Sequence, residues 1–249
     1  TRILLRADGK GDAVVAAALE AGRFLCLAEG TLGRVTSVVA RREETGRKLF
    51  AAPSPAPQAG SGNGAEVGAD FSTLLQAMAS LLPRHNLAVD LGTGDGPFLP
   101  VLAPLYDRVI AVDRSAARLA QAASRLTSLG IPNVRLREGE PENGDLTQEI
   151  EQLGGADLVL ISRVLCYVAT PRDVVSASAR WLRPGGHMLV IDHVPHGDES
   201  FRERGHVWLG FEPASLQSFL LGAGLTCLRT APLCGPQIPP LHMSLGQKP

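Results

Sequence analysis

Residues 90–96 read Asp90-Leu-Gly-Thr-Gly-Asp-Gly96, and they close a short apolar run that begins at Leu87. Glycines let a backbone approach a ligand closely because no Cβ intrudes. A helix that follows such a turn offers free N–H groups to a negative group. The glycine spacing is G-x-G-x-G, whereas a dinucleotide fingerprint would place its third glycine at the position of Pro97. The loop therefore predicts a ligand site and argues against NAD or FAD.

From Leu87 onward, apolar runs that suit strands alternate with segments that suit helices. Repeated units of this kind predict an α/β fold with a doubly wound, mostly parallel sheet and helices on both faces. In such a sheet the ligand binds at the carboxyl ends of the strands. We expect strands at 87–91, 108–113, 133–137, 156–161, 187–192, 225–229 and 241–245, and helices at 98–105, 115–129, 171–182 and 213–221.

Asp113 ends the second predicted strand. A carboxylate at that place can accept hydrogen bonds from both hydroxyls of a ribose. The alternative is a tight turn followed by an ordinary surface aspartate. Because both the glycine loop and Asp113 follow predicted strands, a nucleoside site is favoured.

These motifs resemble those of class I S-adenosylmethionine-dependent methyltransferases. The resemblance lies in residues 89–96, in Val112-Asp-Arg-Ser115 and in residues 181–192, and it extends over about residues 85–230. It implies a Rossmann-like, seven-stranded sheet with a reversed last strand, and S-adenosylmethionine as the cofactor, with S-adenosylhomocysteine as its product. The cofactor contacts that it implies are Asp90, Gly92, Thr93, Gly94, Gly96, Asp113, Arg114, Gly139, Glu140 and Ser162.

The sequence departs from this family at two places. The segment Glu138-Gly-Glu140, which would reach the adenine, carries glutamate where the family more often has aspartate. Ser162-Arg163 would line the methyl-transfer side, where relatives often have histidine or asparagine. The first departure concerns the adenine contact, and the second concerns the group that faces the acceptor.

The N-terminal part has a different composition. Residues 51–64 are rich in Pro, Gly, Ala and Ser and predict a linker, so we divide the chain into 1–50, a linker at 51–68, and a cofactor-binding domain at 69–249. Residues 192–196 and 201–211 resemble methyltransferase domains fused behind ArsR-type winged-helix regulators. That resemblance implies a small winged-helix-like domain in residues 1–50, with a recognition helix at 33–39 and a wing hairpin at 40–50. The segment between Gly30 and Gly33 is short for the complete motif.

Charge leaves the role of residues 1–50 open. The whole chain has a net charge of −1, which gives no bulk attraction to nucleic acid. Residues 1–50 hold nine basic and six acidic side chains, a difference of +3, which is compatible with a few phosphate contacts. We keep two expectations for this segment, formation of a homodimer and binding of duplex DNA. No apolar run is long enough for a membrane span, and the scattered cysteines suit a cytoplasmic protein with free thiols and no bound metal.

Histidines near the fifth predicted strand bear on the chemistry. Methyl transfer from a sulfonium is an in-line displacement, and it needs a base only when the acceptor carries a proton. His193 follows that strand and is the candidate base, whereas His196 and His206 suit loop histidines that bond the backbone. Tyr167, Trp208 and Phe211 either cover the acceptor or belong to the core.

Two functions follow from these observations. The first is a methyltransferase that acts on a small-molecule acceptor. The alternative is an ArsR-type transcription regulator whose domain senses S-adenosylmethionine or S-adenosylhomocysteine.

Overall fold

The computed structural model describes residues 30–51, 77–78, 81–233 and 239–249. Contacts divide the chain into two units, residues 1–42 and 43–249. Residues 52–68 of the predicted linker lie outside the described residues. No helix in the described ranges is long and apolar enough to cross a membrane.

Helix α2 (Thr31–Ala51) corrects one prediction about the N-terminal part. The segment proposed as a wing hairpin with a turn at Glu44-Thr-Gly46 is helical throughout. Glutamates at 43 and 44 pair with Arg47 and Lys48 one turn later, at 3.2 and 2.7 Å. Such i,i+4 pairs stabilise a helix surface and outweigh the turn preference of one glycine. The prediction of a wing at 40–50 is therefore wrong, and a winged-helix domain stays unconfirmed.

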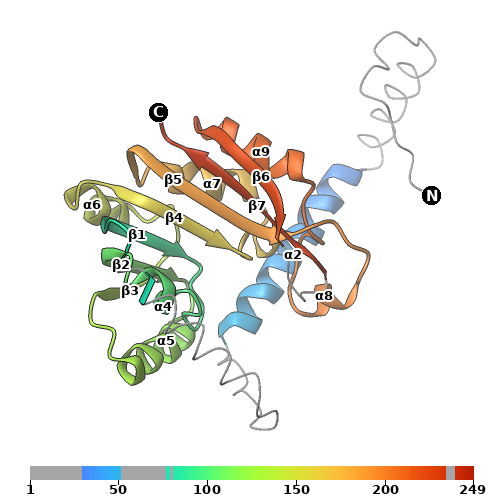
Figure 1. Cartoon of the computed structure of the whole chain (residues 1–249). Helices are drawn as coiled ribbons and strands as arrows, with labels where there is room; N and C mark the ends of the chain where they lie inside the picture. Colours follow the sequence, from blue (N-terminus) through green and yellow to red (C-terminus); the bar gives the residue numbers. More distant parts are fainter. Residues whose placement is uncertain (1–29, 52–76, 79–80, 234–238) are drawn as a thin grey trace. The chain divides into compact units, whose positions relative to one another are not determined.

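In the part of the chain that the structure describes, seven strands form one sheet in the order β3-β2-β1-β4-β5-β7-β6 (Figure 1). Strands β1 to β5 pair in parallel, and β7 lies antiparallel between β5 and β6. The predicted fold class, including the reversed last strand, is confirmed. The strands are β1 His85–Leu91, β2 Tyr106–Asp113, β3 Val134–Glu138, β4 Ala156–Ser162, β5 Leu182–His193, β6 Thr226–Leu233 and β7 Leu241–Gln247.

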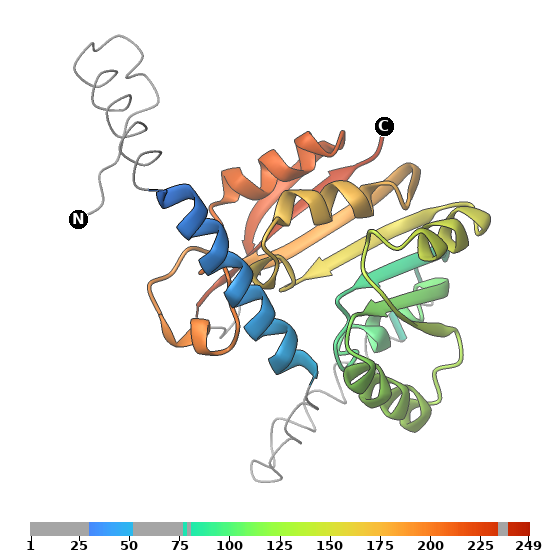
Figure 2. The same cartoon turned by 180° about the vertical axis from the view of Figure 1, so that it is seen from behind.

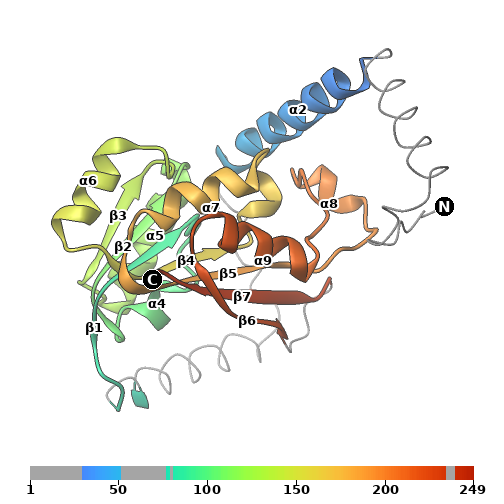
Figure 3. The same cartoon turned by 90° about the horizontal axis from the view of Figure 1, so that it is seen from above.

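Helices cover both faces of this sheet (Figures 2 and 3). Leu87 and Val89 of β1 pack into the same core cluster as residues of α6 (Gly144–Gln152), α7 (Pro171–Ala179) and α9 (Pro213–Gly222). Ala88 packs on the opposite face, with α4 (Leu99–Leu102) and α5 (Ala116–Leu129). This alternation follows from the two-residue period of a strand, and burial on both faces explains why Leu87, Ala88 and Val89 are all apolar.

Capping residues set the ends of α5 as the sequence predicts. The Ser115 side chain accepts a hydrogen bond from the Arg118 backbone N–H, and Gly130 ends the helix in the left-handed conformation with φ of 62°. Serine is among the preferred N-caps, and glycine adopts a positive φ without a steric penalty. Because Ser115 caps the N-terminus, α5 starts directly after the end of β2.

Other boundaries differ from the predictions. Strand β5 begins at Leu182 and runs through Pro184-Gly-Gly186, so α7 is shorter than predicted and ends at Ala179. Helix α4 is a single turn. Helix α6, which the sequence analysis did not predict, buries Leu146 and Ile150 four residues apart. Helix α8 spans only Ser200–Glu203, so His206 lies in the loop after it.

Candidate functional site

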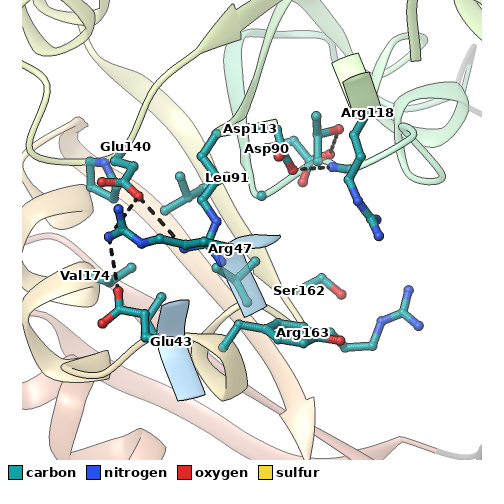
Figure 4. Close-up of a pocket in the computed structure, with 18 of the residues that line it drawn as sticks. Glu43, Arg47, Asp90, Leu91, Asp113, Arg118, Glu140, Ser162, Arg163 and Val174 are labelled. Carbon is teal, nitrogen blue, oxygen red and sulfur yellow. Dashed lines mark hydrogen bonds and ion pairs between the residues drawn. The ribbon is translucent and has the colours of Figure 1, made fainter. Parts of the chain in front are cut away.

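The carboxyl ends of β1, β2 and β4 meet at one edge of the sheet. Strand β1 lies between β2 and β4, so successive βα units depart in opposite directions from this point. Doubly wound sheets form a crevice there. A cavity of about 740 Å³ occupies this edge (Figure 4). All of its lining residues belong to the unit that begins at Glu43.

The glycine loop forms one wall of the cavity. Gly92, Gly94 and Gly96 all have positive φ, at 73°, 59° and 75°. The backbone N–H groups of Gly92 and Thr93 donate to the Val112 carbonyl at 2.8 and 2.9 Å, which holds the loop against β2. A Cβ on Gly92 would lie 2.3 Å from Cγ2 of Val164. The loop therefore needs glycine both for its conformation and for its packing.

Gly96 has a different role from the other two glycines. It does not line the cavity, although Gly92 and Gly94 do. A Cβ on Gly96 would meet Leu99 at 2.7 Å and Ala122 at 3.3 Å. The third glycine allows the helices that follow the loop to pack closely, so its predicted contact with a cofactor has no geometric support.

Asp90 and Thr93 form a buried polar pair at the base of the loop. The Thr93 hydroxyl donates to Oδ2 of Asp90 at 2.7 Å. Burial raises the pKa of Asp90 to about 6; the Thr93 hydrogen bond acts in the opposite direction, and the neighbouring Asp113 adds to the rise. The carboxylate therefore titrates much closer to neutral pH than an ordinary aspartate does.

Asp113 ties the loop to helix α5. Its Oδ2 accepts the Gly94 backbone N–H at 2.8 Å, and its Oδ1 accepts the Ser115 N–H at 2.9 Å. The side chain lines the cavity and is mostly buried. Asp113 thus lies where the sequence places a ribose ligand, and it also supports the neighbouring backbone.

Glu140, which the sequence analysis assigned to the adenine, lies between two guanidinium groups. Its Oε1 is 3.6 Å from Arg47 (Figure 4). The same oxygen is 3.9 Å from the predicted site residue Arg114. Gly139 and Glu140 line the cavity together with both arginines. Arg47 comes from α2, so no local motif could have assigned it to this site. These partly exposed pairs contribute little stability.

His193 and Ser162 lie at the carboxyl ends of β5 and β4, as predicted, and both line the cavity. Nδ1 of His193 is 3.3 Å from the Pro239 carbonyl oxygen. Burial lowers the pKa of His193, and the Pro239 hydrogen bond opposes that shift. A neutral ring that donates from Nδ1 keeps a lone pair on Nε2.

Asp192 stands behind His193 in the core. Its carboxylate accepts the backbone N–H groups of His193 at 2.8 Å and Cys166 at 3.3 Å. Burial raises the pKa of Asp192 to about 6, although these backbone hydrogen bonds act in the opposite direction. Asp192 therefore fixes the backbone around the candidate base, and neither bond involves the imidazole.

Several residues that line the cavity were not predicted from the sequence. Arg118 lies in the first turn of α5, where its Nη1 would be 3.4 Å from a Cβ on Gly94. Helical spacing from the Ser115 cap could have placed it beside the loop. Phe201, Arg204 and His206 also line the cavity, but only the path of the loop after β5 brings them there. Tyr167 lines it too, whereas Phe211 is part of the core.

The pH dependence of stability can test whether His206, which lines the cavity, is buried. Burial lowers the pKa of His206 to about 4, with a further decrease from the nearby His193. A histidine whose pKa is lower in the folded state loses stability as the pH falls from about 6.5 to about 4. For His206→Gln we expect the decrease in unfolding free energy between pH 7 and pH 5 to be smaller than in the parent, by up to about 2 kcal/mol.

Urea unfolding at the two pH values measures this difference, with His187→Gln as the control, because His187 lies at the other end of β5 and outside the cavity lining. Asp90 and Asp192 titrate alike in all three proteins, so their contributions cancel. Parallel pH profiles for the parent and His206→Gln would contradict the burial argument.

Comparison with known proteins agrees with this geometry. Residues 89–188 match a family model described as a methyltransferase domain. The chain is 29% identical over 165 residues to protein-L-isoaspartate O-methyltransferase of Idiomarina loihiensis, with 63% of this chain and 71% of that protein covered. Matches to further relatives cover as little as 29% of the relative's own length. The part of the chain that contains the glycine loop, Asp113 and Ser162 is therefore similar to methyltransferase domains.

Solved structures agree on the fold but differ in reaction. The N-methyltransferase NodS of Bradyrhizobium japonicum, in complex with S-adenosylhomocysteine, has a TM-score of 0.55 at 16% identity, with 84% of this chain and 98% of NodS covered. The [4+2]-cyclase SpnF has a TM-score of 0.55 at 16% identity, with 72% of this chain and 80% of SpnF covered. Since one fold supports different reactions, the acceptor has to be argued from the site.

Proposed function

We propose that the chain is an S-adenosylmethionine-dependent methyltransferase that acts on a small molecule. One observation carries the proposal: a single cavity joins the glycine loop and Asp113 to His193. Its volume of about 740 Å³ lies within the range of about 300–1,000 Å³ that is usual for small-molecule sites. That space suits a nucleoside cofactor together with a small acceptor.

The residues at one end of the cavity fit the cofactor. The backbone N–H groups near Gly94 suit the methionyl carboxylate, Asp113 suits the ribose hydroxyls, and the segment of Gly139 and Glu140 suits the adenine. When bound, S-adenosylmethionine supplies an electrophilic methyl group on a sulfonium. The protein's main contribution is to hold the acceptor atom in line with that methyl group, which can lower the barrier by about 7–11 kcal/mol.

His193 supplies the base in this proposal. Its Nδ1–H donates to the Pro239 carbonyl, so Nε2 is the atom that can take a proton from an acceptor hydroxyl or amine. Its lowered pKa keeps the ring neutral near pH 7, which a base requires. Neighbouring Ser162 has a buried hydroxyl without a hydrogen-bond partner in the described part of the chain, and it is available to the acceptor.

The decisive experiment follows the methyl group. Purified full-length chain is incubated with methyl-tritiated S-adenosylmethionine and a cell extract separated into small molecules, protein and RNA. We expect label in the small-molecule fraction. Label confined to protein or RNA would overturn the small-molecule assignment. Binding of S-adenosylhomocysteine without transfer to any fraction would overturn the assignment as a transferase and favour a sensor.

A pair of histidine variants tests the role of the base. His193→Gln should lower kcat by about 10²–10⁴-fold, the usual contribution of a general base, and leave the affinity for S-adenosylhomocysteine unchanged. His187→Gln, on the same strand but outside the cavity lining, should keep the parent kcat. An unaltered kcat in His193→Gln would remove this residue from the chemistry.

A further inference from the structure

Charge is distributed unevenly among the residues that line the cavity. Six carboxylates line the cavity. One is Glu43 of α2, and five lie at or after the ends of β1, β2 and β3, at the end that suits the nucleoside: Asp90, Asp95, Asp113, Glu140 and Glu142. The lining at the other end, around His193, contains no carboxylate among the described residues. That end presents Ser162, Arg163, Tyr167, Phe201, Arg204 and His206. A molecule bound beside His193 therefore faces cations and neutral groups.

Arg163 is the most unusual of these residues. It is the only residue other than glycine with a positive φ, 55°, in the part of the chain that the structure describes. Its backbone N–H donates to the Ile191 carbonyl at 2.8 Å, which holds this conformation at the end of β4. The left-handed conformation is unfavourable for a side chain with a Cβ, and such residues cluster at functional sites.

The guanidinium of Arg163 has no hydrogen bond or ion pair within the described ranges, and the side chain is exposed. Asp192 is close enough to interact with its charge, but that carboxylate is fully buried and accepts two backbone N–H groups. In Figure 4, Arg163 and Arg118 extend toward the same side of the cavity. Burial raises the pKa of Tyr167, and the positive charges of both arginines oppose that rise. Among the described residues, Arg163 therefore has no carboxylate in direct contact with its guanidinium, and its charge faces the cavity beside His193.

Two further groups face the same end. Arg204 lies over the Phe201 ring, with its guanidinium carbon 4.8 Å from the ring centroid, and the exposed Asp198 offsets part of its charge. His206 is 3% exposed, and its Nδ1 has no hydrogen-bond partner in the described chain. A buried polar atom without a partner is rare and needs an explanation, and a ligand that fills the cavity is one.

We propose that the acceptor carries an anionic group, a carboxylate or a phosphate, which Arg163 binds at this end of the cavity. This proposal rests on the proposed function, because it names the chemical class of that acceptor. A guanidinium offers paired N–H donors that match a carboxylate or a phosphate. Arg204 adds a second positive charge, and the rings of Tyr167 and Phe201 suit an acceptor with an apolar ring.

The test measures anion binding independently of methyl transfer. Full-length chain saturated with S-adenosylhomocysteine is titrated with benzoate, phenyl phosphate and the neutral benzyl alcohol, and binding is followed by NMR. We expect one or both anions to bind at least about tenfold more tightly than benzyl alcohol. Benzoate and phenyl phosphate separate the carboxylate from the phosphate. Equal binding of benzyl alcohol, or no binding of either anion, would overturn the proposal.

Variants of Arg163 connect the effect to this side chain. Arg163→Gln should lower the affinity for the anion by about ten- to hundredfold, and Arg163→Lys should retain part of that affinity. Arg163→Gly should also lose the anion, yet it should raise the midpoint temperature of unfolding, because glycine relieves the left-handed backbone. Arg229→Gln, an exposed arginine on β6, is the matched control and should bind the anion as the parent does.

Failure of the anion-site proposal and failure of the proposed function give different results. Retained anion binding in Arg163→Gln would overturn the assignment of Arg163. Failure of the parent to bind S-adenosylhomocysteine would contradict the proposed function, and the same anion titration on the cofactor-free chain would still report on the anion site.

Discussion

Asp113→Ala should weaken the binding of S-adenosylhomocysteine by about ten- to hundredfold, which corresponds to roughly 1–3 kcal/mol. The variant loses the acceptors proposed for the ribose hydroxyls. It also loses the hydrogen bonds that Asp113 accepts from the N–H groups of Gly94 and Ser115, so the loop is less well held before the ligand arrives. Isothermal titration calorimetry of the full-length chain measures the change.

Two further variants test whether this loss of affinity is specific to the Asp113 carboxylate. Asp113→Asn keeps one acceptor oxygen, so its affinity for S-adenosylhomocysteine should lie between that of the parent and that of Asp113→Ala. Asp107→Ala removes an exposed carboxylate at the opposite end of the same strand, where Asp107 forms only a surface pair with Arg84 at 3.6 Å, and it should bind as the parent does. Unchanged affinity in Asp113→Ala would show that the nucleoside site has been placed wrongly.

Gly92→Ala should lower the free energy of unfolding by about 2–5 kcal/mol and abolish cofactor binding at ordinary concentrations. A left-handed backbone costs a residue with a Cβ about 1–2 kcal/mol. Overpacking adds about 1–3 kcal/mol, because the new methyl group would lie 2.3 Å from Cγ2 of Val164. Urea unfolding measures the loss, and titration with S-adenosylhomocysteine measures binding.

Two further variants separate backbone strain from the clash. Gly130→Ala changes a glycine with φ of 62° and no atom near the new Cβ, so it should cost only the backbone contribution of about 1–2 kcal/mol. The double variant Gly92→Ala with Val164→Ala should recover part of the stability that Gly92→Ala loses, since contacting residues are coupled. Equal destabilisation by Gly92→Ala and Gly130→Ala would contradict the packing argument.

Local patterns were enough to predict most of the domain from the sequence. The apolar runs predicted every strand of the sheet, and Ser115 and Gly130 predicted the ends of α5. The glycine loop and Asp113, which the sequence assigned to a ligand site, line the cavity. These signals work because strand and helix periods, caps and turns depend on residues within a few positions of one another.

Predictions failed where competing short-range preferences were nearly balanced. Glu44-Thr-Gly46 has the composition of a turn, yet charge pairs one helical turn apart keep this segment in α2. Pro184-Gly-Gly186 suggested a break before the fifth strand, but β5 begins earlier and passes through it. Pairs within the same helix decided the first case, and pairing with the neighbouring strands β4 and β7 decided the second.

The sequence by itself determined the α/β fold, the glycine loop between β1 and α4, and the positions of Asp113 and His193 at strand ends. Only the tertiary structure brought Arg118, Arg204 and His206 to the cavity, since Arg118 comes from α5 and the other two follow α8. It also assigned Gly96 to packing rather than to the cavity wall. The physical reason is that the cavity forms where parallel strands end together, so its lining joins residues far apart in the chain that no periodicity links.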